Sequence, residues 1–144
     1  MRFLRAMAVI GCSAATAGTG GANPVWMAPE DLAATFGGRS IAGEYENGDT
    51  FEETYAKDGS ISYRDARRAT AGKWSIRAGT LCTIYDADPS GGCYRVRRAS
   101  ENCFEFHFIA RTEDQVETTP GKPDWTARGW LSNQPKTCVD GENV

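Results

Sequence analysis

Hydrophobic and polar positions alternate along most of the chain beyond residue 39. Turn residues separate the alternating runs, as in Asn47-Gly48 and Lys57-Asp58-Gly59. A period of two is typical of strands that turn one face to a core. The expected strands are Ser40–Glu46, Thr50–Lys57, Ser60–Asp65, Gly72–Ala78, Thr80–Asp86, Cys93–Ala99, Cys103–Arg111 and Thr126–Ser132. This pattern predicts a mainly β fold, an antiparallel meander of about eight short strands curled into a small barrel or sandwich.

A different pattern occupies residues 1–38. Arg2 and Arg5 precede a small, apolar and uncharged stretch, the order found in a secretory signal peptide, which we place at residues 1–22. Cleavage after Ala17 or after Ala22 is compatible with the small residues there. The residues 23–38 then form a lead-in and one short helix, and 39–144 form the β domain. The helix should run from Pro29 to Phe36, with proline in its first turn and Gly37 at its end.

Two other interpretations of the N-terminus stay open. Val9-Ile10-Gly11-Cys12 resembles a bacterial lipobox, in which Cys12 would be acylated and become the mature N-terminus. The second interpretation is a cytoplasmic N-terminus that is not cleaved, disordered or helical. Export therefore predicts a periplasmic or secreted protein, or a lipid-anchored one in the cell envelope.

The hairpin near residue 100 allows its register to be predicted. A three-residue loop ending at Asn102 pairs Val96 with Phe106 and Tyr94 with Phe108, which places these side chains on the core face. Asn102 would then take the left-handed conformation that such loops require. On the outer face the same register sets Arg97 opposite Glu105 and Arg95 opposite His107.

Four cysteines remain beyond the signal peptide, and four cysteines in a small exported domain indicate two disulfides. Extending the register backwards places Cys82 opposite Cys93, with Leu81 against Tyr94 on the core side. We therefore favour Cys82–Cys93 and Cys103–Cys138 among the three connectivities.

Composition narrows the function classes. The chain has 144 residues, a hydrophobic fraction of 40% and a charged fraction of 24%, as in globular proteins. Its net charge of −3 would become −5 on loss of Arg2 and Arg5, since 14 basic residues would face 19 acidic ones. An acidic surface is a poor match for phosphate backbones, so nucleic acid is not an expected partner.

Candidate chemistry is sparse. His107, the single histidine, has only Glu105 nearby on its face, so we predict no metal site. Catalytic and cofactor motifs such as a phosphate-binding loop or a dinucleotide fingerprint are missing, and we predict no catalytic residue and no cofactor. Five acidic residues near the first hairpin could supply a pair for hydrolysis if some of them met in a cleft. They are Glu44, Glu46, Asp49, Glu52 and Glu53.

Aromatic and basic residues offer a binding surface instead. Several basic residues would hold an anionic partner if they shared a face; they are Arg64, Arg67, Arg68, Lys73, Arg77, Arg95, Arg97 and Arg98. The candidate binding residues are Trp26, Arg95, Arg97, His107, Trp125 and Trp130. Candidate partners are an envelope protein, a glycan or a small apolar ligand, and a membrane only if Cys12 is acylated.

One stretch carries a family resemblance. Phe51-x-x-x-Tyr55-x-x-Asp58-Gly59, Gly72-x-Trp74-x-Ile76, Leu81-Cys82 and Cys93-Tyr94 resemble a family of small secreted proteobacterial proteins over about residues 43–97. That family has no assigned activity, so the resemblance implies export and an all-β fold without a mechanism. The Gly-x-Trp strand also resembles those of lipocalin-like barrels, although their N-terminal signature is missing here.

These observations favour an exported, non-enzymatic binding or envelope-associated module. The alternative is a small hydrolase that uses the carboxylates of the first hairpin. A cleft that gathers those carboxylates would favour the hydrolase, whereas an aromatic or basic patch would favour the binding module.

Overall fold

The computed structural model describes residues 25–87 and 91–139, so the predicted signal peptide, its cleavage sites and Cys12 lie outside the described residues. Within these ranges two helices and eight strands follow the chain. In order they are α1 (Pro29–Phe36), β1 (Arg39–Tyr45), β2 (Thr50–Tyr55), β3 (Ser60–Asp65), β4 (Ala69–Arg77), β5 (Thr80–Tyr85), β6 (Gly92–Ser100), β7 (Cys103–Ala110), α2 (Glu113–Thr118) and β8 (Asp124–Leu131).

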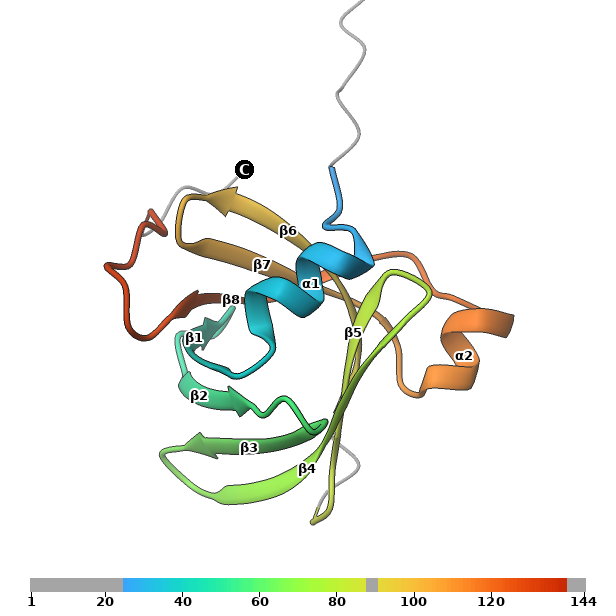
Figure 1. Cartoon of the computed structure of the whole chain (residues 1–144), viewed down its shortest axis with the longest axis horizontal. Coiled ribbons are helices and arrows are strands. Elements are labelled where there is room, and N and C mark those ends of the chain that lie inside the picture. The colour runs from blue at the N-terminus through green and yellow to red at the C-terminus, as the bar shows by residue number, and fades with distance from the viewer. Residues whose placement is uncertain (1–24, 88–90, 140–144) are drawn as a thin grey trace, which may run out of the picture.

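The strands form a closed antiparallel barrel in which each strand pairs with the next and β8 pairs with β1 (Figure 1). Closure joins Ile41 to Leu131, two residues far apart in the chain. The meander and the helix Pro29–Phe36 are confirmed, and of the two architectures left open the barrel is the observed one. Four strands begin earlier than predicted: β1 at Arg39 and β6 at Gly92 by one residue, β4 at Ala69 by three and β8 at Asp124 by two.

The register between β6 and β7 agrees with the predicted one. Val96 pairs with Phe106 and Tyr94 with Phe108. The turn differs, because Ser100 pairs directly with Cys103 and a register shift lies between Arg98 and Ser100. The prediction of a left-handed Asn102 was wrong, since Ala78 is the only described non-glycine residue with positive φ.

Asn102 instead has a structural role inside the protein. Its side chain is 2% exposed and crosslinks the turn to the segment after β8. Nδ2 donates to the carbonyl oxygens of Leu131, Gln134 and Pro135 at 3.2, 3.3 and 3.0 Å, and Oδ1 accepts from the Leu131 amide at 2.9 Å. A buried amide that satisfies several backbone groups fixes the conformation of the segment it binds.

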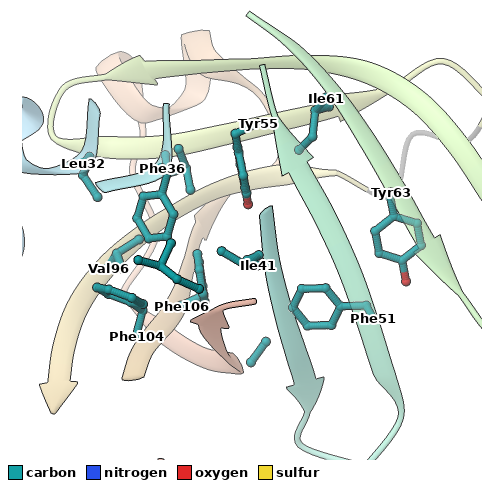
Figure 2. Packing of buried hydrophobic residues seen from close by; sticks show 13 residues of the cluster. Leu32, Phe36, Ile41, Phe51, Tyr55, Ile61, Tyr63, Val96, Phe104 and Phe106 are labelled. Carbon is teal, nitrogen blue, oxygen red and sulfur yellow. The ribbon is translucent and has the colours of Figure 1, made fainter. Parts of the chain in front are cut away.

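α1 fills one end of the barrel. Leu32 and Phe36, four residues apart on one face of the helix, are both fully buried. Figure 2 shows Phe36 beside Val96, Phe104 and Phe106, whereas Phe51 and Tyr63 lie at the other side of the same cluster. The hydrophobic core is therefore densest beneath the helix, and the opposite end of the barrel has no such plug among the described residues.

Both disulfides match the favoured pairing. Cys82 and Cys93 face each other across β5 and β6, on the outside of the barrel, and are bonded. A second small core of Ile109, Ala110 and Val116 covers this bond. Val116 belongs to α2, which the sequence analysis missed because its six residues supply a single buried side chain and no apolar period.

The second disulfide, Cys103–Cys138, ties the C-terminal segment to the start of β7. Thr137, beside Cys138, is hydrogen-bonded to the same turn, since its Oγ1 accepts from the backbone N–H of Asn102 at 2.8 Å. The covalent bond and the Asn102 hydrogen bonds thus hold one segment against one turn.

Candidate functional site

The barrel encloses a cavity of about 330 Å³ at the end away from α1. This volume lies in the range of small-molecule sites, which are commonly concave, largely apolar and furnished with a few polar groups. Its lining consists of Tyr45, Phe51, Glu53, Tyr55, Tyr63, Arg68, Leu81, Thr83, Tyr85, Tyr94, Phe106, Phe108, Arg111, Asp124, Thr126 and Ala127.

The alternation of β2 explains how a carboxylate enters this cavity. Phe51, Glu53 and Tyr55 are buried, while the residues between them are exposed. Since side chains on a strand alternate between its two faces, the same register that buries the two aromatic rings carries Glu53 inside. An acidic residue within an aromatic stripe is a signal in the sequence that indicates a polar group in the interior.

Gly43 of β1 makes room for the Phe51 ring. A Cβ atom at Gly43 would lie 2.3 Å from Phe51 Cζ and 2.7 Å from the Arg128 carbonyl oxygen. The missing side chain allows the ring to lie against the neighbouring strand and leave space inside the barrel.

Glu53 is 7% exposed and receives two phenol hydrogen bonds. The Tyr55 hydroxyl donates to Oε2 and the Tyr85 hydroxyl donates to Oε1. Among the described residues no lysine or arginine forms an ion pair with this carboxylate. Burial raises the pKa of Glu53 above its ordinary value, although the two phenol hydrogen bonds act in the lowering direction.

The remaining phenols form the polar part of the wall. Tyr45 donates to the Tyr63 hydroxyl at 3.2 Å, and Tyr63 donates to Asp65 Oδ2 at 2.7 Å. The Tyr94 hydroxyl has no hydrogen-bond partner in the described part of the chain. Burial raises the pKa of Tyr94 to about 12, so this phenol stays neutral at physiological pH and can donate to a ligand.

Two arginines and an aspartate lie at the strand ends that border the cavity. Arg68, between β3 and β4, stands over the Tyr63 ring at 5.3 Å and lies 3.8 Å from Asp65. Arg111, which follows β7, stands over the Phe108 ring at 5.3 Å and donates to the Gly91 carbonyl at 2.9 Å. With Asp124 they give the open end of the cavity a charged rim.

The carboxylates proposed for a hydrolase do not gather in the cavity. Glu53 lines it, whereas the other four lie on the outer wall or in turns. Glu44 faces Lys136 at 3.5 Å, Asp49 faces Arg67 at 3.4 Å, and Glu52 pairs with Arg64. The predicted cluster therefore supplies one interior carboxylate and no opposed pair.

The basic residues do not form one shared face. Five of them lie on different strands and loops, and each is within ion-pair distance of an acidic residue. These five are Arg64, Arg67, Arg68, Arg77 and Arg97. Paired charges of this kind mainly solubilise a surface.

Most of the predicted binding residues lie together on the outer wall of β6–β8. The Trp26 ring meets His107 edge-on at 5.1 Å, and Arg95 pairs with His107 in the register. Trp125 is joined to the group through Arg128, which stands 5.5 Å over its ring and 3.6 Å from Glu105.

The centre of this outer group is a charged pair. Arg97 binds Glu105 at 2.5 Å, and His107 Nε2 lies 3.5 Å from Glu105 Oε2 without a hydrogen-bond partner among the described residues. Burial raises the pKa of Glu105, but the Arg97 guanidinium opposes it and the net shift is downward. Burial lowers the pKa of His107. Trp130 stands apart, beneath Lys136 at 4.6 Å.

None of the predicted binding residues lines the cavity. Inward-facing aromatic residues were expected to fill a core, so Tyr94 was predicted only as a core-face residue and Tyr45, Tyr63 and Tyr85 were not singled out. In the described ranges no three histidine, cysteine or acidic residues are placed to hold a metal ion. No described helix is long and apolar enough to cross a membrane.

Comparison with known proteins adds no relative. The chain matches no protein-family model, no curated protein and no solved structure. Functional inference therefore rests on the cavity and its chemistry.

Proposed function

We propose that this protein is a non-enzymatic binding module that holds one compact, largely apolar small molecule inside its barrel. The observation that carries the proposal is the cavity itself, which is closed by α1 at one end and bordered by charged residues at the other. Half of its lining residues are aromatic, which favours burial of an apolar ligand body. The wall also carries polar groups, among them the Glu53 carboxyl and the Tyr94 hydroxyl, which can orient a ligand.

We also propose that the protein works in an oxidising compartment outside the cytoplasm. Two disulfides support this placement, because such bonds persist mainly in oxidising environments. The intact mass of the protein purified from its native host tests the proposal. A mature start at Gly18 or Asn23 indicates a released protein, and an acylated Cys12 indicates an anchored one. An intact Met1 with free thiols overturns export.

Fluorescence of N-phenyl-1-naphthylamine, a neutral dye that brightens in apolar sites, tests the binding function. A dye of this size in a preformed aromatic cavity should bind with a dissociation constant of roughly micromolar order. The blocking variant is Thr83→Trp, because Thr83 is 3% exposed and lines the cavity. Its matched control is Thr54→Trp on the exposed face of β2.

The expected result is saturable binding to the wild type and to Thr54→Trp, and a loss of about tenfold or more in Thr83→Trp, since the new ring occupies ligand volume. A cooperative thermal transition confirms that each variant is folded. Dye binding that is missing in the wild type, or equal in a folded Thr83→Trp, contradicts the proposed function.

A further inference from the structure

Glu53 lies at the inner end of the cavity. Its partners in the register are Ile41 on β1 and Tyr63 on β3, and Ile41 is fully buried in the core beneath α1. A ligand that enters past Arg68 and Arg111 therefore meets this carboxyl group after its body has passed between the aromatic walls.

The carboxylate has acceptor capacity left for a ligand. Two carboxylate oxygens offer about four acceptor positions, and the hydroxyls of Tyr55 and Tyr85 occupy two of them. The remaining positions can only be filled by hydrogen-bond donors. A buried carboxylate without a cation is costly, and a positively charged donor offsets that cost better than a neutral one.

The surrounding rings act in the same direction. Phe51, Tyr63, Tyr94 and Phe106 line the cavity together with Glu53. Aromatic faces carry negative potential and attract organic cations, particularly where water is excluded. An anionic ligand group would meet repulsion at this depth and would be directed back to the arginines of the rim.

We propose, resting on the binding function proposed above, that the ligand is a small organic amine whose protonated nitrogen binds Glu53 at the inner end of the cavity. Its apolar body, a ring system of one or two rings, packs between the aromatic walls. The neutral Tyr94 hydroxyl, which has no partner in the described part of the chain, supplies a further hydrogen bond to the ligand.

A matched series of three competitors tests the nitrogen. Tryptamine, tryptophol and indolepropionate share the indole ring but end in an ammonium, a hydroxyl and a carboxylate, and each is titrated against bound N-phenyl-1-naphthylamine at neutral pH. Because hydrogen bonds between charged partners are about twice as strong as neutral ones, tryptamine should displace the dye at a concentration about tenfold below that of tryptophol. Indolepropionate should be the weakest competitor.

Glu53→Gln removes the charge while keeping the shape, and Glu52→Gln makes the same change on the exposed face of the same strand. The preference for tryptamine over tryptophol should fall to about onefold in Glu53→Gln and stay unchanged in Glu52→Gln.

Each outcome decides a different claim. If tryptophol or indolepropionate competes as well as tryptamine on the wild type, the amine proposal fails while dye binding still supports the cavity as a site. The same holds if the preference persists in Glu53→Gln. If the dye does not bind the wild type, the binding function and the amine proposal fail together. The wild-type comparison does not depend on the folding of any variant.

Discussion

Replacement of Asn102 by alanine should destabilise the fold more than its place in a surface turn suggests. The side chain carries two amide hydrogens, shared among three carbonyl oxygens, and one carbonyl oxygen that accepts from the Leu131 amide. At most three full hydrogen bonds are therefore lost. At about 1 kcal/mol for each, the free energy of unfolding should fall by about 3 kcal/mol. Domains of this size have about 5–15 kcal/mol in total, so the loss is a large share.

Glycine at the same position separates two roles of Asn102. If the residue served as a left-handed turn residue, glycine would be tolerated or slightly stabilising, because it adopts positive φ without steric cost. The observed hydrogen bonds depend on the amide, so Asn102→Gly should lose about 3 kcal/mol or more, as alanine does. Asn133 is exposed in the adjoining segment and provides the control. Asn133→Ala should change stability by less than about 0.5 kcal/mol.

Urea unfolding monitored by tryptophan fluorescence measures these differences. Both disulfides are kept oxidised, so that Cys103–Cys138 is common to every variant. An unchanged dependence of free energy on urea shows that the variants unfold from a similarly compact state. A loss below about 1 kcal/mol in Asn102→Ala, or wild-type stability in Asn102→Gly, would refute the role assigned to this side chain.

Two further predictions concern titration. Because burial raises the pKa of Glu53 above 4.5, the folded state holds this proton more tightly, so stability should fall as pH rises through the window between 4.5 and the raised value. The melting temperature of Glu53→Gln should not show this decline, so it should rise relative to that of the wild type as the pH increases. A difference in melting temperature that stays the same at every pH contradicts the assignment. His107 is the single histidine, and the Trp26 ring packs edge-on against it with the ring centroids 5.1 Å apart. Because burial lowers the pKa of His107, Trp26→Ala should raise that pKa in an NMR titration, whereas Trp130→Ala should leave it unchanged. Equal pKa values of His107 in the two variants would show that Trp26 does not cause the lowered pKa.

Strand positions and one register followed from local patterns. Period-two alternation located the strands, and the opposition of Cys82 and Cys93 followed from counting residues through Tyr94 and Leu81. Alternation alone does not separate a barrel from a sandwich, because both bury one face of each strand. That choice depends on pairing between β1 and β8, which involves residues at the two ends of the domain.

The cavity could not be predicted for a related reason. Inward-facing aromatic residues either fill a core or line a space, and their sequence pattern is the same in both cases. Phe36 and Leu32 of α1 occupy one end only, which leaves Phe51 and Tyr63 beside open volume at the other. For the same reason Arg95, Arg97 and His107 of the outer face were predicted as binding residues, whereas Glu53 was predicted only as one member of an acidic cluster.

Closure of the barrel restricts how this protein can meet another chain. Open sheets end in strands with unpaired backbone groups, to which a peptide or a second copy can add a strand. Here β1 and β8 pair with each other, so every described strand has neighbours on both sides. Recognition of a protein partner must rely on side chains of the outer wall or on the connecting loops. The described strands therefore leave no free edge as a template for edge-to-edge aggregation.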